Sequence, residues 1–256
     1  MAACSIGTSH EENGEVCQDN CYANVISLPN GKDFFLGIVS DGAGSSSHGA
    51  QGSDIACSEI KNLIEEWLSK AQTVNPFNKE IVEDWVQSVR KKIFVAAEEN
   101  NLSSREYACT LICTLVGSDF SLFFQLGDGV VIKRGKDGLV PVFWPENGEY
   151  FNTTYFITDD DALNHLQIDF AESFSNDIAM LSDGLQMLSL IYESKSVHQP
   201  FFEPMFKHLR SVDCDACIEL NDQLESFLNS TSINERTSDD KTLILATYIE
   251  SKEIIE

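Results

Sequence analysis

The chain has 256 residues, 43% of them hydrophobic, and its 41 acidic and 17 basic residues give a net charge of −24. This acidity excludes a basic surface for the phosphate backbone of nucleic acid and docking on anionic membranes. No apolar stretch reaches the roughly 20 residues of a membrane helix, and the first residues lack the basic and apolar segments of a signal peptide, so we expect a cytoplasmic protein.

The first predicted elements are a hairpin and two long helices. Residues 22–28 alternate loosely, Asn30-Gly31 is typical of a turn, and the apolar run at 34–40 predicts a buried strand. Residues 55–68 and 79–99 then repeat hydrophobic side chains at helical spacing. Both helices are expected to turn one face toward the core.

Four strands without helices between them come next. Gly127-Asp128-Gly129 and Lys136-Asp137-Gly138 are typical turn sequences, so the pattern predicts an antiparallel meander. The expected strands span residues 108–116, 120–126, 130–133 and 139–143.

The last part of the chain mixes irregular and regular segments. Residues 144–174 are expected to be irregular, with the acidic run Asp159-Asp160-Asp161 in a solvated loop or at a helix start. A short buried strand is predicted at 178–181, helical patterns fill much of 185–228, and a final strand is predicted at 242–249.

Cysteine usage and overall organisation give two further expectations. Several of the eight cysteines lie in apolar runs such as the one from Cys109 to Cys113, which is typical of reduced, packed thiols. Cys214-Asp-Ala-Cys217 is a lone CxxC motif, and without a second pair we predict no zinc site there. Because no linker or repeat is evident, residues 1–256 are expected to form one domain of a layered α+β fold.

Aspartates recur at the ends of the apolar strands. Asp41, Asp128 and Asp183 each follow a hydrophobic run, and Asp19 and Asp239 each precede one. Each alone is compatible with a turn. If adjacent strands bring them to one rim, they repel each other unless cations neutralise them. Oxygen ligands select hard ions such as Mg²⁺ or Mn²⁺, and two such ions can activate a water for attack on phosphorus.

Six motifs carry a resemblance to a known family. Their content and order along nearly the whole chain resemble the metal-dependent protein phosphatase 2C (PPM) family, in particular its bacterial stand-alone catalytic domains. In chain order they are GTSHEENGEVCQDN, FFLGIVSDGAG, ACTLICTLV, FFQLGDGVVIKR, DIAMLSDGL and TSDDKTLILA.

The resemblance implies a fold and a reaction. The family fold is a four-layer α-β-β-α sandwich, in which two antiparallel sheets are flanked by helices. The implied reaction is hydrolysis of phosphoserine and phosphothreonine on proteins, with two Mn²⁺ or Mg²⁺ ions and in some bacterial relatives a third, weaker one. The implied partners are phosphorylated proteins and a Ser/Thr kinase whose action the phosphatase opposes, and a monomer is expected.

The resemblance also assigns roles by position. Asp41 would bridge two metal ions, and the backbone of Gly42 would hold the second. Asp183 and Asp239 would complete the shell of the first ion. Asp19 would act nearby, through metal-bound waters or by orienting them.

The resemblance also implies a site for the third ion, and at two positions this chain lacks a residue that other family members have. Asp128, with Asp183, matches the site of the weaker third metal. An arginine that binds phosphate in many eukaryotic members is replaced by Gly14, so that His10 or a metal would take over. The histidine proposed there as general acid is Ala43 in this chain, which leaves His48, the nearest in sequence, as the candidate proton donor.

Two other functions stay open at this point. A catalytically silent regulator of the same fold would bind phosphoproteins without hydrolysing them, although every metal-binding Asp is present. A metal-dependent hydrolase of small phosphorylated molecules would use the same aspartates. In either case Asp240, which replaces the usual Asn, is expected to lie behind Asp239 as its partner.

Overall fold

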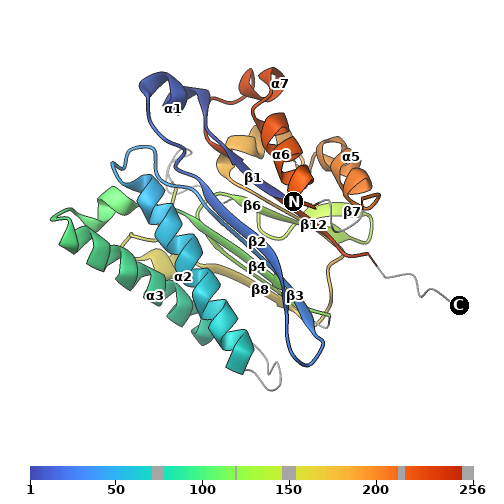
Figure 1. Ribbon diagram of the computed structural model, residues 1–256, viewed down its shortest axis with the longest axis horizontal. Helices are drawn as coiled ribbons and strands as arrows, with labels where there is room; N and C mark the ends of the chain where they lie inside the picture. Colours follow the sequence, from blue (N-terminus) through green and yellow to red (C-terminus); the bar gives the residue numbers. More distant parts are fainter. Residues whose placement is uncertain (71–77, 119, 146–153, 213–216, 250–256) are drawn as a thin grey trace, which may run out of the picture.

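The computed structural model describes residues 1–70, 78–118, 120–145, 154–212 and 217–249. Two five-stranded antiparallel sheets pack against each other, and helices cover both outer faces (Figure 1). The predicted α+β sandwich with four layers is therefore confirmed. No helix in the described residues is long and apolar enough to cross a membrane.

The first sheet, called sheet I here, carries the predicted hairpin and has the strand order β2-β3-β4-β5-β8. Its outer face packs against the long helices α2 (Gly49–Lys70) and α3 (Lys79–Glu99), which bury an apolar stripe including Ile60 and Val86. The strands are β2 (Asn20–Ser27), β3 (Asp33–Ser40), β4 (Leu111–Val116), β5 (Ser121–Leu126) and β8 (Gln167–Ala171).

The second sheet, sheet II, has the order β1-β12-β9-β6-β7 and joins the two ends of the chain. Helices α5 (Gln199–Leu209) and α6 (Cys217–Leu228) cover its outer face, where Phe202, Phe206 and Leu224 are buried. The strands are β1 (Ala2–Ser5), β6 (Val130–Gly135), β7 (Gly138–Pro141), β9 (Asp177–Leu181) and β12 (Lys241–Thr247).

Short elements fill the connections. The helices among them are α1 (Thr8–Asn13), η1 (Ser104–Tyr107), η2 (Ala162–His165), η3 (Asp183–Leu185), α4 (Gln186–Ser189) and α7 (Thr231–Asn234). A small hairpin pairs β10 (Leu190–Ile191) with β11 (Ser196–Val197).

A separate apolar layer lies between the sheets. It includes Val39 and Phe123 from sheet I and Val131, Met180 and Ile244 from sheet II, all almost fully buried. Since strands such as β4, β5 and β9 are covered on both faces, every residue in them is buried. This explains why they form continuous apolar runs in the sequence rather than alternating patterns.

The predicted four-strand meander is wrong. Strand β5 pairs with β4 and β8 in sheet I, whereas β6 pairs with β7 and β9 in sheet II. Gly127-Asp128-Gly129 therefore carries the chain from one sheet to the other instead of closing a hairpin. Gly127 has a φ of +117°, and a Cβ there would lie 2.6 Å from the Thr110 side chain, so the crossing depends on glycine.

Three other expectations need correction. The region 144–174 contains strand β8, whose edge position and half-buried residues weaken the apolar pattern. The N-terminal strand β1 is only four residues long and was not predicted. Helix α2 begins at Gly49 rather than near residue 55, because part of the glycine- and serine-rich stretch is helical.

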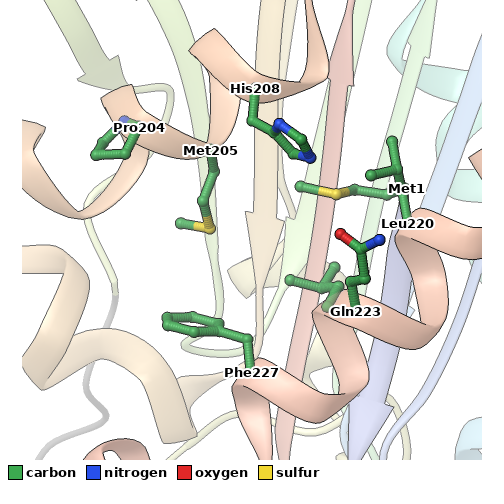
Figure 2. Close-up of a pocket in the computed structure, with 8 residues that line it drawn as sticks. Met1, Pro204, Met205, His208, Leu220, Gln223 and Phe227 are labelled. Carbon is green, nitrogen blue, oxygen red and sulfur yellow. The ribbon is translucent and has the colours of Figure 1, made fainter. Parts of the chain in front are cut away.

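Two features lie away from the strand ends. A small apolar cavity of about 220 Å³ lies between α5 and α6, lined by Met205, His208 and Phe227 among others (Figure 2). It belongs to the outer helix layer and contains none of the aspartates. Cys214 is outside the described residues, so the expected absence of zinc at Cys214–Cys217 stays a prediction. The described cysteines are free thiols.

Candidate metal centre

The aspartates gather because antiparallel pairing brings the right strand ends together. In sheet I, Asn20 pairs with Ser40, so Asp19 and Asp41 lie at the same end of the hairpin. In sheet II, Leu181 pairs with Leu243, which places Asp183 near the start of β12, where Asp239 lies. Both pairs of aspartates face the same rim of the sandwich.

Asp41 is the centre of the group. The carboxyls of Asp19 and Asp183 both interact with its own carboxyl. Burial, followed by the charges of Asp19 and Asp183, raises the pKa of Asp41 well above its usual range. Burial is also the main cause that raises the pKa of Asp183 to about 8, with the charges of Asp128 and Asp239 adding to it.

Asp19 is anchored from sheet II although it belongs to sheet I. The hydroxyls of Ser182 and Thr242 each donate to Asp19 Oδ2 at 2.7 Å. These bonds oppose the burial that raises the pKa of Asp19 to about 6. The carboxylate is thus fixed across the interface between the two sheets.

The strand-end aspartates offer the oxygen ligands that hard cations prefer. Asp19 Oδ1 and Asp183 Oδ1 are buried and have no hydrogen-bond partner, and an unpaired buried carboxylate oxygen is costly. Across the described residues, no three His, Cys, Asp or Glu side chains are already placed so that they could hold a metal ion. The buried carboxylates repel each other, and bound cations would relieve that repulsion. An all-oxygen set of this kind matches Mg²⁺ or Mn²⁺.

The glycine after Asp41 also has a packing reason, and its expected role at a metal stays a prediction. The sequence predicts that Gly42 lets its carbonyl approach a metal. A Cβ on Gly42 would lie 2.5 Å from the backbone of Gly49, so the glycine allows β3 to end directly against the start of α2. With its side-chain amide turned so that the nitrogen faces them, Gln18 donates to the carbonyls of Gly42 at 3.2 Å and Ala43 at 3.0 Å.

Asp128 lies on the side of Asp183 and Asp239, whose charges interact with its own. Thr154 Oγ1 donates to Asp128 Oδ2 at 2.5 Å, and Gln186 Nε2 donates to its backbone carbonyl at 2.5 Å. Burial raises the pKa of Asp128, and the bond from Thr154 opposes that shift. Asp128 is therefore held beside the group, close to its exposed member Asp239.

The carboxylate of Asp240 points toward Gly7 and Gln18 rather than toward Asp239. Its backbone N–H donates to Asp239 Oδ1 at 2.9 Å, so the two residues are partners through the main chain. Its carboxylate is only 2% exposed and accepts the N–H groups of Gly7 and Gln18, both at 2.6 Å. No local sequence pattern indicates this direction, because the contacts join residues more than 200 positions apart.

His48 lies beside η1. Its Nδ1 is 2.9 Å from Ser47 Oγ, its ring centroid is 5.0 Å from that of Tyr107, and its N–H donates to Glu106 O. These contacts join His48 to η1 rather than to an aspartate. Its role as proton donor stays a prediction.

We expect the metal-free protein to lose stability as the pH rises from about 4, the ordinary pKa of a carboxyl, through about 6 for Asp19 and up to about 8 for Asp183. In this range the folded state holds protons that the unfolded state has released, so the free energy of unfolding falls with pH. Thermal unfolding in excess chelator should show a decrease of at least about 3 °C, corresponding to about 1 kcal/mol. Asp183→Asn should flatten the profile. A wild-type midpoint that is constant or rises over this range would contradict the expectation.

Comparison with known proteins finds similar sequences and folds among protein phosphatases. Residues 6–229 match the family profile of protein phosphatase 2C. Serine/threonine-protein phosphatase 3 of Escherichia coli (strain K12) is 34% identical over 248 residues, which is 97% of either chain. The crystal structure of a bacterial serine phosphatase has a TM-score of 0.64 and 15% identity over 98% of both chains. The catalytic domain of the phosphatase PstP in complex with 2 manganese ions has a TM-score of 0.60 and 15% identity over 96% of both.

Proposed function

The chain belongs to the protein phosphatase 2C family and is a metal-dependent protein phosphatase, and we propose that it hydrolyses phosphoserine and phosphothreonine with Mn²⁺ or Mg²⁺ held by its strand-end aspartates. The observation that carries this proposal is the buried group of Asp19, Asp41 and Asp183, whose carboxyls interact with one another and leave two buried oxygens without hydrogen-bond partners.

Each aspartate has a part in the proposal. Asp41 would hold both ions, and the carbonyl of Gly42 would contribute to the second. Asp183 and Asp239 would complete the first ion's ligands, and Asp19 would orient the waters around it. When bound, two such ions lower the pKa of water and supply a hydroxide for attack on phosphorus near neutral pH. Asp128, beside Asp183 and Asp239, would hold a third and weaker ion.

The leaving group needs a proton donor, and His48 is the candidate that the sequence predicts. We assign His48 as the donor, although its present contacts with Ser47 and Tyr107 require it to turn toward the substrate. Its place next to the first turn of α2, just after the glycine-rich stretch that follows Asp41, supports the assignment.

The organisation and partners of the enzyme are part of the same proposal. Residues 1–256 act as one catalytic domain and as a monomer. The substrates are phosphorylated proteins, whose phosphate groups a Ser/Thr kinase has added. A cytoplasmic location agrees with the free thiols of the described residues.

A substrate panel tests the reaction class. With Mn²⁺ present, we expect turnover of a phosphothreonine peptide to exceed that of a nucleotide and of a generic phosphate ester. Turnover of the nucleotide alone would replace the proposal by a small-molecule phosphatase. Tight binding of the phosphopeptide without hydrolysis would replace it by a silent regulator, which the intact set of aspartates does not favour.

A further inference from the structure

Gly14 stands where many family members have a phosphate-binding arginine, and in this chain it has a structural role. Gly14 ends helix α1 with a left-handed φ of +72°, and its N–H donates to Glu11 O at 3.1 Å. Glu15 N then donates to His10 O at 2.9 Å, which completes the helix cap. A side chain at Gly14 would be strained in this conformation. The positive charge for a phosphate must therefore come from another residue or from a bound metal ion.

Helix α1 itself is fixed against the segment that carries Asp239. Ser9 donates to Ser238 O through its N–H at 3.0 Å and its hydroxyl at 2.7 Å. A Cβ on Gly7 would lie 2.4 Å from the backbone carbon of Asp239, so the two segments are in direct contact. The side chains of α1 are thereby placed at the rim where the aspartates meet.

His10 is the side chain of α1 that points inward. It is 11% exposed, and its Nδ1 lies 3.0 Å from Asp240 Oδ2 as an ion pair rather than a well-aligned hydrogen bond. The other ring nitrogen, Nε2, faces the turn after Asp41, since a Cβ built on Gly44 would lie 3.9 Å from it. The imidazole thus reaches from a buried carboxylate to the glycine-rich turn beside Asp41.

The charges around His10 favour the imidazolium. Burial acts to lower the pKa of His10, but the close carboxylate of Asp240 outweighs it, and the charges of Glu15 and Asp239 raise the pKa further. Glu15 Oε2 lies 3.7 Å from Nε2, and the Glu15 side chain is about half exposed. This carboxylate is free to swing into solvent, so that another anion can take its place at Nε2.

We propose that His10, held by Asp240, binds the phosphoryl group of the substrate in place of the missing arginine. Its Nε2–H donates to a phosphoryl oxygen, and Glu15 is displaced when the substrate enters. Asp240 is the positioning residue, with both of its oxygens fixed by backbone N–H groups. This inference rests on the proposed function, because it takes phosphorylated proteins as the substrates.

His10→Gln tests the proposal because glutamine keeps an N–H donor but loses the charge. With Mg²⁺ bound, we expect the KM for a phosphothreonine peptide and the inhibition constant of inorganic phosphate each to rise about tenfold, a loss of about 1.4 kcal/mol. The turnover number should change much less. His208→Gln, on α5 in the outer helix layer (Figure 2), is the matched control and should leave all three constants unchanged.

Two further measurements separate binding from structure. Glu15→Gln removes the competing carboxylate and should lower the inhibition constant of phosphate. The imidazole Cε1–H NMR signal of His10 in the Mg²⁺-loaded protein should shift on titration with inorganic phosphate. Unchanged KM and inhibition constants in folded His10→Gln, or a signal that phosphate does not move, would overturn the proposal. An inactive wild-type protein would instead overturn the proposed function.

Discussion

Replacing Asp41 by Asn is expected to lower the turnover number by about 10³-fold or more, which corresponds to about 4 kcal/mol of transition-state stabilisation. Asn keeps the size of the side chain but removes the charge that lies between Asp19 and Asp183. In the proposed site this removes the shared ligand of both cations, so we expect activation of water to fail. Turnover of a phosphothreonine peptide in saturating Mn²⁺ measures the effect.

The same variant should fold. Asp41 is hydrogen-bonded to Thr110 through its backbone N–H and C=O, and both bonds survive the substitution. The metal-free Asn variant should unfold at the wild-type temperature or above it, because a repulsive carboxylate is gone. Asp128→Ala is the comparison: calorimetry should find two tight ions retained and only the weaker one lost. Wild-type turnover in Asp41→Asn would reduce the Asp-Gly stretch to an ordinary turn.

Removal of divalent cations by EDTA is expected to abolish activity, and Mn²⁺ or Mg²⁺ should restore it. The aspartates meet across the two sheets, so bound cations also join the sheets. At a free metal concentration 100 times the dissociation constant, the gain is about 2.7 kcal/mol. For a chain of this size that raises the unfolding temperature by about 5 to 10 °C.

Calorimetric titration and thermal unfolding in the same buffers give independent readings of this effect. Zn²⁺ serves as the control, since an all-oxygen site should restore less activity with a metal that prefers nitrogen and sulfur. Undiminished hydrolysis of the phosphopeptide in excess EDTA would exclude the metal mechanism. Restored activity with no change in unfolding temperature would mean that the ions do not bridge the sheets.

The strand-end aspartates were predictable from the sequence for a physical reason. Buried strands such as β3 and β9 have strongly apolar residues, so the polar residue that follows each one is conspicuous. Antiparallel pairing then requires that Asp19 and Asp41 share one end. The family resemblance supplied the roles, because a strand-end carboxylate alone is also compatible with a turn.

Other features depend on contacts that no local pattern contains. The division of the expected meander between two sheets follows from the crossing at Gly127, whereas Gly-Asp-Gly is equally typical of a hairpin. The direction of the Asp240 carboxylate depends on Gly7 and Gln18, which are far away in the sequence. A buried charge satisfied by distant backbone groups leaves no trace in hydrophobic periodicity.

The pairing of β1 with β12 has a consequence for the time at which the enzyme becomes active. Met1 N donates to Leu245 O across 244 positions, and Asp239 lies two residues before β12. At about 5 to 20 residues per second, a ribosome adds the last strand roughly 12 to 49 seconds after the first. Until then the nascent chain carries Asp19 and Asp41 without Asp239. With the metal ligands proposed above, we expect a growing chain to be inactive until β12 has been synthesised.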